Sequence, residues 1–268
     1  MVHIPKKLEQ LHSILLDYGR VAVAFSGGVD SSLLVKCALD SLGAGNVLIL
    51  FGSSSLLVSE DEQRVQEWLP AHGYTKGVEL QIVDLQPLSW KEFCVNSEER
   101  CYQCKLRMYK RFKEVMEKKG FSLLLDGTNT DDLKNNRPGI RAINQLGVKI
   151  PLVEAGLDKA AVRKCSRHLE LTTWQLPSAS CLATRIPHGL PVTEERLRTI
   201  EQFERGVLQF GLSQCRVRLD KDSPKTVYVQ LSEQDLTAVM NQDIRVAMVR
   251  FFHNNGIQNV YLNMVGRH

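Results

Sequence analysis

A glycine-rich turn between an apolar strand and an amphipathic helix constrains this chain more than any other feature. The turn is Ser26-Gly27-Gly28-Val29-Asp30-Ser31, and the apolar run 21–25 before it is typical of a buried strand. Apolar residues then recur at helical spacing across 31–42. The turn therefore places free backbone N–H groups at a helix N-terminus, where the helix dipole also favours negative charge. We expect a phosphate site here, with the hydroxyls of Ser26 and Ser31 as donors and Asp30 orienting the loop or holding a metal ion.

The rest of the first two thirds of the chain alternates strands with helices. Further strands are predicted at 46–51, 79–84 and 122–125, and helices at 7–18, 59–72 and 105–119. This alternation predicts βαβ units and an α/β fold whose parallel sheet is covered on both faces. Ligands of such sheets bind at the carboxyl ends of the strands, where segments 26–31, 52–55 and 126–129 are expected to lie.

The pattern changes after about residue 190. A helix is predicted at 193–210 and another at 241–254, and strands are predicted at 215–219, 226–231 and 257–262. The first two of these strands flank a Lys221-Asp222-Ser223-Pro224 turn, which favours antiparallel pairing. We therefore predict a parallel-sheet domain over 1–190 and a smaller α+β domain over 191–268.

The composition narrows the classes of function. Hydrophobic residues make up 43% of the chain and charged residues 24%, and no apolar run approaches membrane-spanning length or the core of a signal peptide, so we expect a cytoplasmic protein without a membrane partner. The net charge of +4 suits small anionic ligands such as nucleotides, and no block of basic residues favours a nucleic acid. Seven cysteines in such a protein indicate thiol or metal chemistry rather than disulfides.

The glycine-rich turn is neither of two well-known phosphate loops. It lacks the Lys-Ser/Thr pair of a Walker A loop and the Gly-x-Gly-x-x-Gly of a dinucleotide fingerprint. It resembles the PP-loop of the ATP pyrophosphatases, whose domain has the adenine nucleotide alpha hydrolase-like fold. The resemblance implies that ATP is bound by Ser26, Gly27, Gly28, Asp30 and Ser31. The plain alternative is a strand–turn–helix connection with a capping serine.

A second polar turn, Asp126-Gly127-Thr128-Asn129-Thr130-Asp131-Asp132, follows the predicted strand 122–125. Gly127, Thr128 and Asn129 are candidates for contacts to the ribose or phosphates of ATP. The carboxylates of Asp30 and Asp131 are candidate ligands of Mg²⁺, which prefers oxygen atoms shared with substrate phosphates. The alternative is an ordinary Asp/Gly/Asn turn.

Three cysteines are candidates for metal or sulfur chemistry. Cys101 and Cys104 form a Cys-x-x-Cys pair that can reach one metal or each other, and no second pair completes a structural zinc site. Cys181 lies in a Pro/Ser/Ala-rich segment and is the candidate third ligand. Three ligands leave one metal position open, and in an iron–sulfur cluster they leave one iron free for an external sulfide. The alternative is that Cys101 and Cys104 are a buried or redox-silent thiol pair. Cys37, by contrast, matches the apolar face of its helix and is expected in the core.

Two arginines alternate with apolar residues in the predicted strand 215–219. Because side chains in a strand point to opposite faces in turn, Arg216 and Arg218 share one face. Two guanidinium groups on one face can clamp a phosphate or a carboxylate. A solvated strand face is the alternative.

These motifs together resemble the LarE family of ATP-dependent pyridinium-3,5-biscarboxylic acid mononucleotide sulfurtransferases, which act in nickel-pincer nucleotide cofactor biosynthesis. The resemblance extends from about residue 20 to 262. Besides the PP-loop and 126–132, the matching blocks are Arg100-Cys101-Tyr102-x-Cys104-Lys105, Arg137-Pro138-Gly139, Pro151-Leu152-x-Glu154-Ala155-Gly156-Leu157 and Ser180-Cys181-Leu182-Ala183-x-Arg185 followed by Pro187 and Gly189. The family usually has Tyr at the position of His188, and it continues beyond the position of His268 in a Ser/Gly-rich tail.

The resemblance implies a mechanism and further site residues. A substrate carboxylate attacks the α-phosphate of ATP, pyrophosphate leaves, and sulfur then displaces AMP to give a thiocarboxylate. Cys101, Cys104 and Cys181 are implied to hold a [4Fe-4S] cluster that delivers the sulfide. Lys105 and Arg185 are implied near the reacting centre, and Thr184 with Arg216 and Arg218 at the substrate phosphate or carboxylate. Other members instead give up the sulfur of the cysteine at the position of Cys181.

The family also assembles as hexamers, and its sulfide source is not evident from this sequence.

Two other functions compete with this one. A PP-loop tRNA thiolase, or another PP-loop amidating or thiolating enzyme, shares the ATP loop, and the thiolase needs an RNA-binding face that the sequence does not indicate. A non-catalytic iron–sulfur or zinc protein that binds nucleotide would share the cysteines but release no pyrophosphate.

Overall fold

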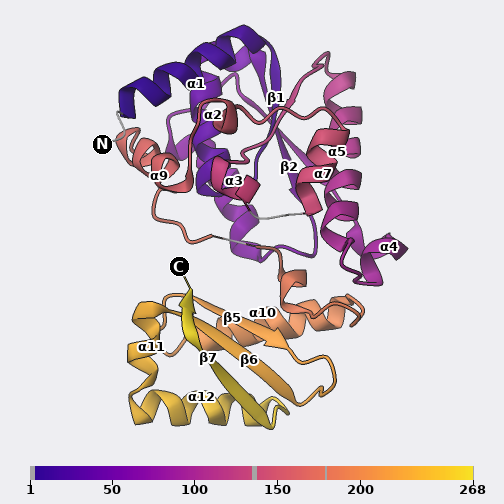
Figure 1. Ribbon diagram of the computed structural model, residues 1–268, viewed down its shortest axis with the longest axis vertical. Coiled ribbons are helices and arrows are strands. Elements are labelled where there is room, and N and C mark those ends of the chain that lie inside the picture. Colours follow the sequence, from indigo (N-terminus) through magenta and orange to yellow (C-terminus); the bar gives the residue numbers. More distant parts are fainter. Residues whose placement is uncertain (1–3, 135–137, 179, 268) are drawn as a thin grey trace. The chain divides into compact units, whose positions relative to one another are not determined.

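The computed structural model describes residues 4–134, 138–178 and 180–267, and Arg137 of the sequence motif therefore lies outside the described residues (Figure 1). The chain forms two compact units. The first comprises Met1–Gln86 and Cys101–Ala179, and the second comprises Pro87–Arg100 and Ser180–His268. The segments 87–100 and 180–190 thus belong to the second unit, although the sequence places the boundary at 190. The division into a domain over 1–190 and a domain over 191–268 stays a prediction.

The first unit contains an all-parallel sheet of four strands, as expected. The strands are β1 (Val21–Ala24), β2 (Val47–Ser53), β3 (Glu79–Asp84) and β4 (Leu124–Leu125), in the order β3-β2-β1-β4. In the centre, β1 pairs with β2 on one side and with β4 on the other. Gly52 and Ser53, expected in a loop, belong to β2. A Cβ atom at Gly52 would lie 2.4 Å from a methyl carbon of Leu85, so a larger residue at this strand position would have to displace the Leu85 side chain.

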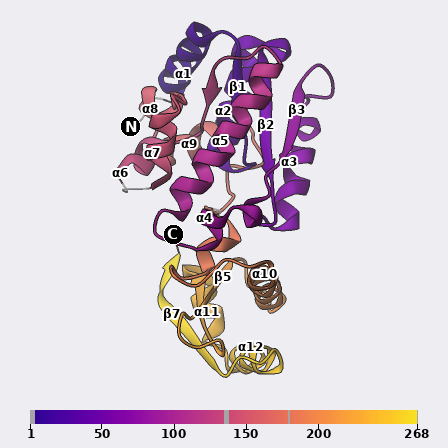
Figure 2. The same ribbon diagram turned by 90° about the vertical axis from the view of Figure 1, so that its right-hand side faces the viewer.

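Helices cover both faces of this sheet. On one face lie α1 (Ile4–Tyr18), α2 (Val29–Leu42) and α9 (Lys159–His168), and α5 (Arg100–Lys118) lies on the opposite face (Figures 1 and 2). The helix α3 (Ser59–Ala71) joins the same core as α2 through Val65 and Trp68. No helix within the described ranges is long and apolar enough to cross a membrane.

Several short elements of the first unit were not expected from the sequence. They are α6 (Thr130–Lys134), α7 (Pro138–Gln145), α8 (Pro151–Glu154) and the 3₁₀ turn η1 (Ala44–Asn46), and the longer α9 was also missed. In α9, buried Ala161, Val162 and Cys165 alternate with charged residues, and its N-cap is the Asp158 side chain, which accepts from the amide of Ala161. The apolar face is narrow and small, so periodicity alone does not reveal it.

The helix α5 begins five residues earlier than expected, at Arg100 instead of Lys105. Cys101 and Cys104 therefore lie in its first turns and not in a loop before it. Residues three apart in a helix occupy neighbouring positions on its surface, so the two thiols share one side of α5.

The second unit is a small α+β structure around a three-stranded sheet. Its strands are β5 (Cys215–Leu219), β6 (Thr226–Ser232) and β7 (Asn259–Arg267), in the order β5-β6-β7. The β5–β6 pair is antiparallel, as predicted, whereas β7 pairs with β6 in parallel. The helices are α4 (Lys91–Cys94), α10 (Glu194–Leu208), α11 (Glu233–Val239) and α12 (Gln242–Asn254), with 3₁₀ turns η2 (Pro87–Ser89) and η3 (Leu182–Arg185). Of these, α4, α11 and both 3₁₀ turns were not expected from the sequence, because they are short. Phe203, Val217, Val229 and Phe252 form the core.

One carboxylate fixes the entry into β5, the strand that carries the two arginines. Asp235 accepts the amide of Ser213 at 3.0 Å, the hydroxyl of Ser213 at 2.8 Å and the amide of Gln214 at 3.0 Å. The hydroxyl of Ser232 donates to it at 2.7 Å. Burial acts to raise the pKa of Asp235, but these hydrogen bonds, which favour the ionised form, lower it overall.

We predict that Asp235→Asn lowers the free energy of unfolding at pH 7 by about 1–3 kcal/mol, because an amide cannot accept all of these bonds. Since the folded-state pKa of Asp235 lies below its ordinary value, the carboxylate's contribution is complete above that value and is lost as the pH falls through the folded pKa. The difference in urea unfolding between parent and variant should therefore stay constant above about pH 4 and narrow as the pH falls below it. Asp222→Asn, at an exposed turn residue, is the control. A parent–variant difference that does not change with pH would contradict the prediction.

Candidate active site

The glycine-rich loop joins β1 to α2 in the first unit, as the sequence predicts. Gly28 is the N-cap of α2, and Gly27 has a positive φ of 71°. The Ser31 hydroxyl accepts from the amide of Ser26 at 3.2 Å and donates to the carbonyl of Gly28 at 3.1 Å. The two serine hydroxyls lie 3.1 Å apart. These bonds close the loop on itself and leave its glycine backbone at the N-terminus of a fourteen-residue helix, the geometry that binds phosphate groups.

The second polar turn packs directly against this loop. A Cβ atom at Gly127 would lie 3.0 Å from the backbone nitrogen of Ser31 and 3.2 Å from the carbonyl carbon of Asp30. Only glycine permits such an approach without a shift of backbone. The chain order of the strands reverses between β1 and β4, and the two turns follow these two strands. Ligands of open parallel sheets bind at such a reversal, outside the carboxyl ends of the strands.

A charged cluster connects the two turns through Asp30. The Asn129 amide donates to one carboxylate oxygen of Asp30 at 3.0 Å, and the Lys159 ammonium forms an ion pair with the other. The backbone amide of Lys159 donates to Asp131 at 3.0 Å, and Lys134 forms an ion pair with Asp131 at 2.6 Å. The structure therefore brings together the ATP-loop candidates and both Mg²⁺ candidates, and it adds Lys159.

Sequence reasoning missed Lys159. The motif block that ends at Leu157 stops two residues before it, and the only local signal is Asp158, the N-cap of α9. A lysine in the first turn of a helix has no distinctive pattern in sequence. It reaches Asp30, 129 residues earlier, because α9 packs beside α2 in the tertiary structure.

Lys105 belongs to a separate network on the other turn residue, Asp126. Its ammonium lies 3.4 Å from the Asp126 carboxylate and over the ring of Tyr109, at 5.3 Å from its centroid. Asp126 also accepts from the Tyr109 hydroxyl and from the Thr128 amide, the latter at 2.8 Å. Burial acts to raise the pKa of Asp126, but the Lys105 charge and these hydrogen bonds lower it overall. Lys105 is thus held at the edge of the turn 126–132.

The three candidate cysteines are divided between the two units. Cys101 is exposed and Cys104 half-buried in the first unit, and Cys181, also half-buried, precedes η3 in the second. Cys37, Cys165 and Cys215 are buried, which agrees with the core position expected for Cys37. Among the described residues, no three or more His, Cys, Asp or Glu side chains form a group that could hold a metal ion. The spacing of Cys101 and Cys104 fits two ligands of one metal centre, and Cys181, the third candidate, belongs to the other unit.

The turn that carries Cys181 is held by Thr184 and Arg185. The Cys181 carbonyl accepts from the Thr184 hydroxyl at 2.8 Å and from the Arg185 guanidinium at 3.1 Å. Arg185 is buried and bidentate on Glu204, with distances of 2.8 and 3.1 Å. It also donates to the Ser180 carbonyl at 2.7 Å. Every one of these bonds ties Arg185 to the protein itself, so its observed contacts orient the Cys181 turn.

Both strand arginines lie on β5 and are half-buried. Arg218 donates to the Thr184 carbonyl at 2.8 Å. Burial and the neighbouring charge of Arg185 lower the pKa of Arg218, and the Glu204 carboxylate opposes them. The second unit thus gathers Thr184, Arg185 and Arg218 behind Cys181 with one carboxylate between them, and this excess of positive charge suits an anion.

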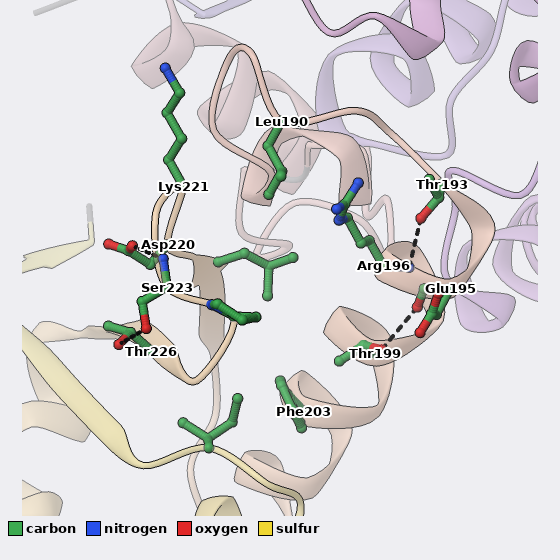
Figure 3. Close-up of a pocket in the computed structure, with 13 residues that line it drawn as sticks. Leu190, Thr193, Glu195, Arg196, Thr199, Phe203, Asp220, Lys221, Ser223 and Thr226 are labelled. Atoms are coloured by element: carbon green, nitrogen blue, oxygen red, sulfur yellow. Dashed lines mark hydrogen bonds between the residues drawn. The ribbon is translucent and has the colours of Figure 1, made fainter.

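The second unit also contains a cavity of about 480 Å³ between the start of α10 and the β5–β6 turn (Figure 3). Thr193, the N-cap residue of α10, lines it together with Arg196 and Phe203 from the helix and Lys221 and Ser223 from the turn. No residue that the sequence assigns to the site lines this cavity. The cavity is therefore separate from the residues on which the candidate chemistry depends.

Comparison with known proteins gives three informative relatives. The chain is 32% identical over 266 residues to an uncharacterized protein of Synechocystis sp. (strain ATCC 27184 / PCC 6803 / Kazusa), covering 98% of this chain and 95% of that protein. It is 30% identical over 222 residues to the pyridinium-3,5-bisthiocarboxylic acid mononucleotide synthase of Lactiplantibacillus plantarum, covering 83% and 79%. An uncharacterized protein of Methanocaldococcus jannaschii is 24% identical over 245 residues, covering 91% and 89%. No family model matches the chain.

We predict that Glu204→Ala lowers the free energy of unfolding by about 3–5 kcal/mol, because it leaves the buried Arg185 without its carboxylate. Glu194→Ala on the same helix is the matched control, since its pair with Arg198 is exposed and 3.9 Å long. The control substitution should lower the free energy of unfolding by about 0–1 kcal/mol. Urea unfolding measures both, and equal losses in the two variants would contradict the assigned importance of the buried pair.

Proposed function

The chain belongs to the LarE family of pyridinium-3,5-bisthiocarboxylic acid mononucleotide synthases, and on that basis we propose that it is an ATP-dependent sulfurtransferase of nickel-pincer nucleotide biosynthesis. Its substrate is pyridinium-3,5-biscarboxylic acid mononucleotide, of which a carboxylate becomes a thiocarboxylate. The observation that carries the ATP-dependent step is the close packing of the Gly127 turn on the Ser31 backbone. It brings the two turns proposed to bind phosphate, 26–31 and 126–132, together at the point where the strand order reverses.

The first step is adenylation, for which the first unit supplies the groups. The loop 26–31 and the α2 N-terminus bind the phosphates of ATP, and the Lys159 ammonium adds positive charge beside them. A substrate carboxylate oxygen bonds to the α-phosphorus, the bond to the bridging oxygen breaks, and pyrophosphate leaves with the electron pair. Fixed N–H donors and cations stabilise the departing charge more in the transition state than in free ATP.

The Mg²⁺ ion that accompanies ATP in such a reaction fits Asp30 better than Asp131. A carboxylate shared with phosphate oxygens suits Mg²⁺, and Asp30 lies in the phosphate loop itself. Each carboxylate already has a lysine ammonium and an amide as partners, Lys159 and Asn129 at Asp30 and Lys134 and the Lys159 backbone at Asp131, so the position of Asp30 in the loop is what distinguishes the two. When bound, the ion neutralises phosphate charge.

The second step is sulfur transfer, for which the second unit supplies the groups. Sulfur attacks the acyl carbon of the adenylate and AMP leaves, which gives the thiocarboxylate. Arg216 and Arg218 bind the phosphate or a carboxylate of the substrate by charge-assisted hydrogen bonds. Arg185 and Thr184 hold the Cys181 turn through its carbonyl. Lys105, next to the nucleotide-binding turn, binds the reacting carboxylate.

Cys101, Cys104 and Cys181 supply the sulfur chemistry. They would hold a [4Fe-4S] cluster with one iron free of protein ligands, and such a cluster supplies sulfide from an external donor. The paired thiols on one side of α5 support two of these ligands. The rival source is Cys181 itself, which would lose its sulfur and become dehydroalanine in a single turnover. Hexameric assembly and a cytoplasmic location stay predictions.

We predict that Asp30→Ala and Lys159→Met each abolish substrate-dependent pyrophosphate release, because both remove charge from the phosphate loop while leaving the sheet intact. Lys36→Met is the matched control: it removes a lysine that pairs with Asp40 at 2.6 Å on the same helix, away from the loop. Release is measured with ATP, Mg²⁺ and the biscarboxylate substrate. Release at the parent rate in Asp30→Ala or Lys159→Met would contradict the phosphate-loop assignment for that residue.

We predict that Cys101→Ala and Cys104→Ala both lose iron and multiple turnover, whereas Cys94→Ala, at a cysteine outside the proposed set, retains them. Iron and labile sulfide are measured after anaerobic reconstitution, and turnover is measured with added sulfide. The sacrificial alternative predicts one turnover and the mass loss of one H₂S at Cys181. That mass loss in an active, iron-free protein would overturn the cluster proposal.

A further inference from the structure

Two buried polar side chains from the segment 94–100 hold the loop that follows Cys181. Asn96 has no solvent exposure, although its side chain is a primary amide. This amide donates to the carbonyl of Pro187 at 2.8 Å and to that of Leu190 at 2.6 Å. Asn96 also has a positive φ of 59°, a backbone conformation that non-glycine residues keep only where surrounding contacts determine it.

Arg100 extends this arrangement toward Cys181. It is 4% exposed, and its guanidinium donates to the Ala183 carbonyl at 2.8 Å and to the side-chain oxygen of Asn96. Two backbone bonds join the same segments, from Gly189 to the Asn96 carbonyl at 3.0 Å and from Val192 to the Cys94 carbonyl at 2.9 Å. All of these residues belong to the second unit. The segment 94–100 and the loop 183–192 thus interlock through buried polar bonds whose side-chain partners lie 83 to 94 positions apart in sequence.

These bonds hold one end of the turn that carries Cys181. Cys181 is the N-cap of η3, and Ala183, whose carbonyl Arg100 binds, is the second residue of that turn. Arg185 and Thr184 fix the Cys181 carbonyl. The Cys181 turn is therefore held independently by two buried arginines, and Arg100 is also the residue that directly precedes Cys101 in the chain.

We infer that Asn96 and Arg100 are positioning residues for Cys181, which fix the turn from which it takes part in sulfur transfer. This inference rests on the proposed function, because it assigns Cys181 to the sulfur-transfer step. The adenylation groups lie in the other unit, in the loop 26–31. Loss of the buried bonds should therefore impair sulfur transfer and leave adenylation intact. A residue that only stabilises the fold would lower both steps together.

The test uses Arg100→Lys, which keeps the charge but removes the guanidinium, and Asn96→Gly, which tolerates the positive φ but removes the amide. Arg111→Lys, at an exposed arginine on the same helix as Arg100, is the matched control. The reconstituted full-length protein is assayed with ATP and the biscarboxylate substrate for pyrophosphate and thiocarboxylate. Hydrogen exchange of the amides in 183–192 is measured on the same samples without substrate.

We expect both variants to release about ten or more times as much pyrophosphate per thiocarboxylate as the parent, with the KM for ATP unchanged, since one buried hydrogen-bonding partner corresponds to about a tenfold effect or more. Exchange in 183–192 should accelerate by a similar factor, and the control should match the parent. A parental product ratio in both variants, or equal loss of both products, overturns the inference. If Arg100→Lys does not fold, Asn96→Gly decides by the same criteria.

The exchange measurement separates this inference from the proposed function. If the parent releases no pyrophosphate with substrate, the proposed sulfurtransferase function fails, whatever the variants do. Faster exchange at 183–192 in the variants would then still support the inference that the Asn96 and Arg100 side chains hold the Cys181 turn. Parental exchange in both folded variants would overturn it, even in a protein that is fully active.

Discussion

The pairing of β1 with β2 on one side and β4 on the other is the constraint on which the candidate nucleotide site depends. Because both pairings are parallel, the turns that leave β1 and β4 emerge at the same edge of the sheet. They meet so closely that the Gly127 turn touches the backbone of Ser31. A Cβ atom at Gly127 would press on the backbone of Asp30 and Ser31, next to the hydrogen bond between Asp30 and Asn129. The geometry of the phosphate loop is thus set by the sheet as much as by its own glycines.

Charge in the two units is balanced in different ways. In the first unit, the carboxylates of Asp30, Asp126 and Asp131 each lie beside a lysine at the rim of the sheet. These pairs are partly exposed, so they can exchange partners with phosphate or a cation at modest cost. In the second unit, the Arg185–Glu204 pair is buried and bidentate. Breaking this buried pair strongly lowers the free energy of unfolding, so the pair serves to hold the conformation of the turn that carries Cys181.

This difference suits the proposed function, in which the first site changes its partners during each turnover and the Cys181 turn stays fixed. In the proposed function, Lys159 can leave Asp30 when ATP binds, because both side chains reach solvent. Arg185 and Arg100 have no such freedom, since both are buried and bound to backbone carbonyls around Cys181. Sulfur transfer from a cysteine-bound source depends on placing one sulfur atom relative to a reactive adenylate, and a rigid turn favours that placement.

The sequence alone determined the parallel sheet, the position of the phosphate loop, the antiparallel β5–β6 pair and the family, because these depend on local periodicity and on short motifs whose spacing is fixed by chemistry. Strand bounds at 79–84 and 215–219 agree with the structure to the residue. The sequence pattern did not predict short helices such as α7 and α11, because their few apolar residues become informative only when a partner surface buries them.

Only the tertiary structure decided which polar groups meet. Lys159 reaches Asp30 because α9 packs beside α2, and Arg185 meets Glu204 because η3 lies against α10. The tertiary structure also placed Cys101 and Cys104 inside α5, and it joined Asn96 and Arg100 to the loop after Cys181. Sequence carries the identity of such residues but not their partners, because a buried polar side chain takes its partner from whichever distant segment the fold brings within hydrogen-bonding distance.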